Sequence, residues 1–166
     1  MHLGFYKLVK NLLSVEQCSN ILESLPIQEE IKLLSGEIST IDQWHKNKIT
    51  DQRCSLNVDK DLLSILEQNL PNNLTYISDR MYVTKYDVGQ ECTSHTDPSD
   101  ITAIILLNND FHGGDLIINK RKVTLKMGDA IIFSDRLVHS VNKITNGTRY
   151  ALSIWLNIQT NNKGKG

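Results

Sequence analysis

The hydrophobic period of the chain changes at one point, and that change limits the folds it can adopt. After Thr75, apolar and polar residues alternate in short runs, as expected of strands. Glycine, proline and asparagine separate these runs, notably at Gly89, Pro98 and Gly113-Gly114. The predicted strands cover residues 80–86, 94–95, 101–107, 115–119, 122–125, 129–133, 138–143 and 148–158. Many short strands at regular spacing predict a sandwich or barrel.

Two helical patterns precede these strands. Ser14 and Gln17 have the spacing of a capping box, and apolar residues follow at helical spacing until Pro26. A second amphipathic helix is predicted at residues 59–70, closed by Pro71. The combination predicts an α+β domain, in which N-terminal helices support a double-stranded β-helix core of the jelly-roll, cupin-like type.

The remaining N-terminal segments carry weaker signals. Residues 5–9, 30–34 and 53–58 are predicted as short strands. Residues 35–51 are polar and lack clear periodicity, which predicts a long surface loop. Two interpretations of this loop stay open: a lid over a functional site, or a simple mobile connection.

Length and charge set outer bounds. The 166 residues predict one domain over residues 1–160, with its core at about 80–158 and a flexible tail at 161–166. The net charge of −1 gives no reason to expect a nucleic-acid or membrane partner, and oligomeric state stays open. Three unpaired cysteines and a first ten residues without a signal-peptide pattern predict a cytoplasmic protein.

The triplet His95-Thr96-Asp97 carries the clearest chemical signal. Side chains alternate along a strand, so His95 and Asp97 point to the same face. His139 is the best candidate for a third ligand, and Arg149 follows at the start of the last long strand. Two histidines and one carboxylate are the donor set of a non-haem Fe(II) oxygenase. Burying Arg149 would be costly without an anionic partner, such as a keto-acid co-substrate.

Each of these residues also has a simpler explanation. A His-x-Asp triplet occurs by chance, and a lone histidine such as His139 is usually a core or surface residue. The argument depends on the ordered combination, which a barrel would bring together at one mouth. His112 falls in a turn, which disfavours it as a ligand, and Asp115 is expected to close the Gly-Gly turn. Other polar residues are open to two interpretations: His45 is either exposed or a substrate contact in the loop, and Asp135 and Arg136 either line the mouth near His139 or pair with each other.

The C-terminal half resembles the 2-oxoglutarate- and Fe(II)-dependent dioxygenase superfamily, in its prolyl 4-hydroxylase-like branch. The matching motifs are Tyr86-Asp87-Val88-Gly89, His95-Thr96-Asp97, Leu107-Asn108, Gly113-Gly114-Asp115-Leu116, residues 128–133, His139-Ser140-Val141 and residues 147–155. Phe133-Ser134-Asp135-Arg136 and Thr148-Arg149-Tyr150-Ala151 look particularly like the hypoxia-sensing prolyl hydroxylases. The resemblance covers roughly residues 80–156.

The resemblance implies a role for each site residue. His95, Asp97 and His139 would hold Fe(II), leaving positions for 2-oxoglutarate and O₂, with ascorbate as an optional reductant. Arg149 would bind the distal carboxylate of 2-oxoglutarate, with help from Tyr86 and Ser153. The hypoxia-sensing enzymes carry a tyrosine at the position that matches Leu106, and Tyr82 is a candidate to replace it. Trp155 is open to two interpretations, a core aromatic or a substrate contact.

The resemblance implies hydroxylation of a protein or peptide residue, with proline as the first candidate, and release of succinate and CO₂. A second hypothesis is a 2-oxoglutarate dioxygenase acting on another protein side chain, a free amino acid or another small molecule; a nucleobase is disfavoured. A third is a non-enzymatic, metal-binding cupin-like domain, in which Arg149 would have no carboxylate to bind.

Overall fold

The computed structural model describes residues 6–24, 30–32, 38–40, 45–46, 52–134 and 136–160. Most of the predicted loop at 35–51 and the whole of the predicted tail at 161–166 lie outside these residues. The tail and the single-domain boundary therefore stay predictions, and so does the loop except at residues 38–40 and 45–46, which form strands. The described helices are α1 (Val15–Ser24) and α2 (Lys60–Glu67). The described strands are β1 (Tyr6–Val9), β2 (Glu30–Lys32), β3 (Ile38–Thr40), β4 (His45–Lys46), β5 (Gln52–Leu56), β6 (Tyr76–Tyr86), β7 (Cys92–His95), β8 (Ile101–Leu106), β9 (Phe111–Gly113), β10 (Leu116–Ile118), β11 (Arg121–Val123), β12 (Ala130–Ser134), β13 (His139–Val141), β14 (Ile144–Gly147) and β15 (Arg149–Ile158).

The largest sheet runs in the order β1-β12-β8-β15-β6-β5-β4, with antiparallel neighbours throughout. Two of its interior strands, β8 and β12, are buried at every position. Successive residues of β12 enter different cores: Ile131 and Phe133 face one, Ile132 the other. Burial on both faces explains why these strands are continuous apolar runs, since neither face meets water.

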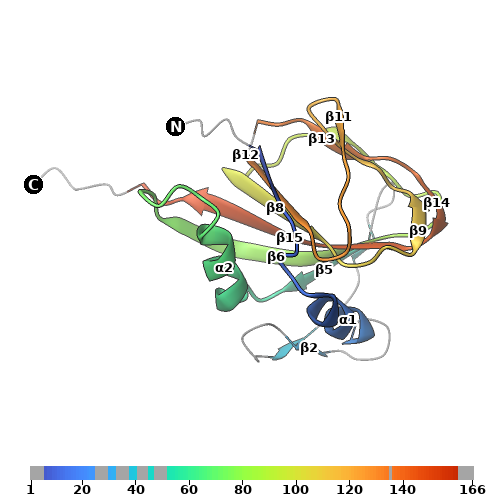
Figure 1. Cartoon of the computed structure of the whole chain (residues 1–166), viewed down its shortest axis with the longest axis horizontal. Coiled ribbons are helices and arrows are strands. Elements are labelled where there is room, and N and C mark those ends of the chain that lie inside the picture. The colour runs from blue at the N-terminus through green and yellow to red at the C-terminus, as the bar shows by residue number, and fades with distance from the viewer. Residues whose placement is uncertain are drawn as a thin grey trace, which may run out of the picture.

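A smaller sheet, β11-β10-β13-β7, and the pair β14-β9 face the largest sheet. The core between them contains Ile104 and Phe133 from the large sheet and Leu116, Ile118 and Val141 from the small one. Figure 1 shows β11 and β13 on one side of the large sheet and both helices on the other. Two facing antiparallel sheets of this topology form a double-stranded β-helix, so the predicted fold class is confirmed.

The helices cover the outer face of the large sheet. In α1, the Ser14 Oγ accepts from the Gln17 amide (3.0 Å) while the Gln17 Oε1 accepts from the Ser14 amide (2.9 Å), which confirms the predicted capping box. Asp59 caps α2 by accepting from the amides of Asp61 and Leu62. Buried residues of both helices, among them Cys18 and Leu62, share one core with the outer face of β8 and β12. Neither of these helices is long and apolar enough to cross a membrane.

The structure differs from the predicted strands in several places. It adds β9 and β14, where the Gly113-Gly114 and Asn146-Gly147 dipeptides predicted turns. These two strands are short, mostly exposed and paired with each other, so no alternating apolar face marks them in the sequence. Strand β6 begins at Tyr76 and β7 at Cys92, both earlier than predicted. Within the predicted loop, β3 pairs with β2 and β4 pairs with β5.

Gly128, just before β12, contacts the backbone of Leu13, just before α1. Replacing Gly128 tests this contact. Its φ is +91°, and an added Cβ would overlap the Leu13 carbonyl oxygen. We expect Gly128→Ala to lower the free energy of unfolding by about 3 kcal/mol or more, combining backbone strain with displacement of that carbonyl. Urea denaturation followed by circular dichroism measures the change.

Gly89→Ala is the matched control for this substitution. Its φ is +85°, but an added Cβ would meet nothing within 4 Å. We therefore expect only the backbone penalty, about 1–2 kcal/mol. Equal losses for the two variants would show that contact with Leu13 does not matter.

Candidate metal and carboxylate site

The pairing of β7 with β13 places two histidines side by side. The strands are antiparallel, and His95 at the end of β7 lies directly opposite His139 at the start of β13. Residues opposite each other in an antiparallel pair project to the same face. The two imidazole centroids are accordingly 4.3 Å apart.

Asp97 completes the cluster from the segment just after β7. One carboxylate oxygen lies 3.4 Å from the His95 Nε2 and the other 3.2 Å from the His139 Nε2. One donor atom from each of the three residues lies within 4.8 Å of the other two. The Thr102 hydroxyl on β8 donates to the Asp97 Oδ2 at 2.6 Å and fixes the carboxylate. The structure thus brings together the three residues predicted from sequence as ligands.

Backbone carbonyls orient both imidazoles. The His95 Nδ1 is 2.7 Å from the Thr93 carbonyl oxygen, and the His139 Nδ1 is 2.9 Å from the Leu137 carbonyl oxygen. A carbonyl can only accept, so each Nδ1 carries the proton and donates. In the neutral tautomer the Nε2 lone pairs therefore point toward the carboxylate of Asp97, which is the arrangement expected of histidine metal ligands.

Charge within the cluster shifts two pKa values. Hydrogen bonds with Asp97 and then Cys92 raise the pKa of His95 from 6.5 to about 10, against the effect of burial. Burial raises the pKa of Asp97, but hydrogen bonds with His139, His95 and Thr102 outweigh it and hold that pKa well below its usual range. The cluster therefore contains an ionised carboxylate, Asp97, beside an imidazole, His95, that binds a proton tightly.

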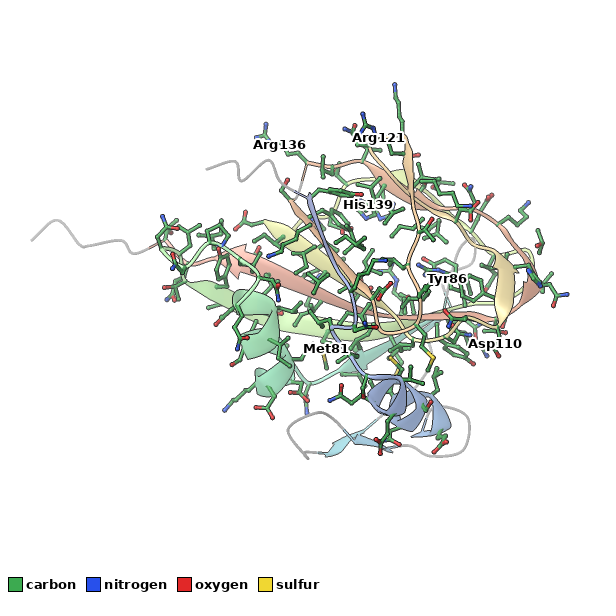
Figure 2. The ribbon with its side chains drawn as sticks, viewed as in Figure 1. Met81, Tyr86, Asp110, Arg121, Arg136 and His139 are labelled. Atoms are coloured by element: carbon green, nitrogen blue, oxygen red, sulfur yellow. The ribbon has the colours of Figure 1, made fainter. Side chains whose placement is uncertain are left out.

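All seven residues singled out as site residues line one cavity of about 430 Å³, a volume that includes its open mouth. They are His95, Asp97, His139, Arg149, Tyr86, Tyr82 and Ser153. Figure 2 shows His139 and Tyr86 between the two sheets, with Arg121 and Arg136 pointing away from the molecule. The sheet geometry explains the grouping: Tyr82 lies opposite Ser153 and Tyr86 opposite Arg149, so all four project from the same face of the β6–β15 pair.

Arg149 is the buried cation of this cavity. It is only 3% exposed, and its guanidinium carbon lies 5.5 Å from the Tyr86 ring centroid. Burial lowers the pKa of Arg149, opposed by Tyr86 and Cys92. No carboxylate in the described part of the chain lies within 4.0 Å of its guanidinium nitrogens. A buried guanidinium without an internal counter-ion is suited to bind an anion from outside.

Other residues weighed from the sequence lie elsewhere. Trp155 and Leu106 do not line this cavity; each lines a different one. His112 and Arg136 are exposed. Asp115 forms an ion pair with Lys122 (3.1 Å) instead of closing the Gly-Gly turn. The side chain of His45 and the whole of Asp135 lie outside the described residues.

Sequence reasoning missed four cavity residues with polar or thiol side chains, Thr102, Thr84, Arg53 and Cys92, and three apolar ones, Ile104, Val141 and Ala151. Thr102 had a usable signal, because it is the one polar residue in the strand Ile101–Leu106. The cysteine and the arginine had none. Cys92 lines the cavity as the first residue of β7, a strand predicted to begin only at residue 94. Arg53 lines it because β5 pairs with β6.

Two nitrogen donors, one carboxylate and a separate buried cation suit a divalent metal together with an anionic co-ligand. The donor set has too few histidines and no thiolate in the triad, which disfavours a closed structural zinc site. The three donor residues line the cavity, so a metal bound between them would be accessible to a co-ligand from it.

Comparisons with known proteins agree with this chemistry. A family model described as the 2OG-Fe(II) oxygenase superfamily matches residues 81–157. A PKHD-type hydroxylase of Gluconobacter oxydans is 24% identical over 174 residues, covering 89% of this chain and 75% of the relative. The family name implies Fe(II), 2-oxoglutarate and O₂, and it favours the enzyme hypotheses over a non-enzymatic cupin-like domain.

Solved structures share the fold. A prolyl-4-hydroxylase of Pseudomonas putida superimposes with a TM-score of 0.64 at 14% identity, covering 95% of each chain. A prolyl hydroxylase of Trichoplax adhaerens, in complex with a hypoxia inducible factor peptide fragment, gives 0.66 at 16% identity, covering 93% of this chain and 84% of the other. The fold, the donor set and the family match over residues 81–157 agree, and the chain is thus similar to members of the 2OG-Fe(II) oxygenase superfamily.

Proposed function

We propose that this oxygenase hydroxylates a residue of a protein or peptide, with proline as the first candidate, and forms succinate and CO₂ as co-products. The observation that carries the proposal is one cavity that combines the cluster His95, Asp97 and His139 with the buried cation Arg149. Prolyl hydroxylases among the structural relatives, one of them bound to a peptide, support a peptide substrate.

In this proposal each residue has a defined task. His95, Asp97 and His139 hold Fe(II), and Thr102 keeps the carboxylate in place. Arg149 binds the distal carboxylate of 2-oxoglutarate, with Tyr86 and Ser153 beside it on the same sheet face. Bound iron and 2-oxoglutarate together supply the O₂ activation that C–H hydroxylation requires. No protein nucleophile is needed, so the cavity's own residues bind, orient and exclude water.

Tyr82 lies opposite Ser153, with its ring centroid 5.6 Å from that of Trp155 and 5.0 Å from the guanidinium carbon of Arg53. It lines the cavity, which supports its proposed role as a co-substrate or substrate contact. A cytoplasmic location and the absence of nucleic-acid or membrane partners stay predictions from composition.

The function is tested by turnover. Purified protein with Fe(II), 2-oxoglutarate and ascorbate should convert a proline-containing peptide to a product heavier by 16 Da, with one succinate formed per hydroxylation. Mass spectrometry of a broad peptide panel and a succinate assay measure the two products. Succinate formed with free amino acids but with no peptide of the panel would contradict the proposed substrate class.

The metal-free cluster should depend on pH through His95. Because its pKa is raised from 6.5 to about 10 in the folded protein, the cluster stabilises the metal-free fold fully below pH 6.5, and this contribution is lost as the pH rises toward 10. A metal must displace the same proton, so apparent affinity should rise about tenfold per pH unit between pH 7 and 9.

NMR titration of the His95 imidazole and Co(II) binding at several pH values measure these two effects. Asp97→Asn removes the main cause of the shift, so His95 in that variant should titrate closer to 6.5. A wild-type His95 that already titrates near 6.5 would refute the coupling with Asp97.

Arg149→Lys tests the carboxylate site. A lysine keeps the charge but cannot form the bidentate pair, so we expect 2-oxoglutarate to bind about tenfold or more weakly while metal affinity is unchanged. Calorimetry of 2-oxoglutarate binding to the Co(II) protein measures this effect without turnover. Arg121→Lys, on an exposed strand outside the cavity, is the matched control. An unchanged 2-oxoglutarate affinity would remove Arg149 from the site.

A further inference from the structure

A second cavity adjoins the metal cavity and has no role in the proposed chemistry. It measures about 420 Å³ with its open mouth and is lined by Arg80, Pro98, Ser99, Trp155 and Asn157. Two connections join it to the metal cavity. Pro98 and Ser99 directly follow the proposed ligand Asp97, and Trp155 touches Tyr82, whose ring lines the metal cavity. Lining residues of the two cavities are thus neighbours along the chain and across the β6–β15 pair.

Arg80 is the charged group of this second cavity. It lies opposite Trp155 in the β6–β15 pair, and its guanidinium carbon is 5.4 Å from the Trp155 ring centroid. Stacking on an aromatic ring uses the face of the guanidinium and leaves its edge N–H groups able to donate. The stack therefore orients the Arg80 guanidinium and leaves its edge N–H groups able to bind an anion. Because the side chain is already held in place, it loses less conformational entropy when an anion binds.

The surroundings of Arg80 provide no competing anion among the described side chains. No described carboxylate lies within 4.0 Å of its guanidinium nitrogens. Asp100 directly follows the lining residue Ser99 but does not itself line the cavity. Its carboxylate accepts from the Ile158 amide at 2.8 Å. The Ser99 hydroxyl is buried and donates to the Ile101 carbonyl. Among the described residues, Arg80 is thus the single charged residue that lines this cavity.

We infer that Arg80 and this cavity form a subsite for an acidic side chain of the peptide substrate. The inference rests on the proposed function, because it assumes a peptide that spans both cavities. Tyr82 and Ser153 line the metal cavity, and Arg80 and Trp155 lie two residues further along the same strands, a step of roughly 7 Å. An extended peptide covers that step with about two residues, so the acidic residue lies two or three positions from the reacting one.

The test uses a set of synthetic peptides with one central proline in an alanine and glycine background. Each carries one aspartate at a position from three before to three after the proline, and asparagine peptides serve as neutral controls. We expect aspartate at a position two or three residues away, on one side only, to lower KM about fivefold relative to asparagine, with kcat unchanged.

Arg80→Ala should abolish this preference while turnover of the neutral peptide stays the same. Arg80→Glu should reverse it, so that a lysine peptide becomes the better substrate. Arg121→Ala is the matched control, because Arg121 is an exposed arginine on β11 that lines neither cavity and should leave the preference intact. Titration with the same peptides under anaerobic conditions, followed by tryptophan fluorescence, gives a binding readout that does not depend on turnover.

The outcomes of these experiments distinguish failure of the subsite from failure of the proposed function. If wild-type protein hydroxylates aspartate and asparagine peptides alike, the subsite is overturned and the proposed function stands. If the preference survives in Arg80→Ala, the subsite is elsewhere and the inference is wrong. If no peptide is hydroxylated or bound, both the peptide substrate and the subsite are rejected.

Discussion

The pairing of β7 with β13 is the constraint on which the candidate site depends. It sets His95 opposite His139, and the following segment then brings Asp97 between their Nε2 atoms. Because side chains alternate along a strand, a slip of one residue would turn one imidazole to the opposite face of the small sheet. The relative position of the two histidines is therefore set by the backbone pairing of β7 with β13. The hydrogen bonds from both Nδ1 atoms to carbonyls extend that control to the orientation of the rings.

The two faces of the large sheet divide the molecule into a part that stabilises and a part that binds. Its outer face packs against α1 and α2 in a hydrophobic core. Its inner face is apolar around Phe133 but carries Tyr82, Tyr86, Arg149 and Ser153 along β6 and β15. Burying a charged group such as the guanidinium of Arg149 is costly unless an anion binds it, so we expect the protein to retain it for ligand binding. The same strands continue outward to Arg80 and Trp155, which links the chemistry to the proposed peptide subsite.

Sequence patterns within one segment correctly predicted the elements that depend on neighbouring residues along the chain. The capping box at Ser14 and Gln17 is formed as predicted, and the apolar runs at β8 and β12 are buried strands. Predictions failed where pairing alone makes a strand: β9 and β14 contain the glycines of predicted turns and exist because each lies beside the other. Thr102 shows a similar limit. Its polarity within an apolar strand was visible, but its partner, Asp97, is a contact set by the fold.

The sequence by itself determined the chemistry available to this protein: two histidines, a carboxylate and an arginine, in an order that resembles one oxygenase superfamily. It also determined the alternation that builds a double-stranded β-helix, because period-two patterning follows from the geometry of a strand. Only the tertiary structure decided which side chains share a cavity, since cavities are made by strands distant in sequence. It placed Thr102 behind Asp97, left Arg149 buried without a carboxylate in the described chain, and set Arg80 against Trp155 at a second opening.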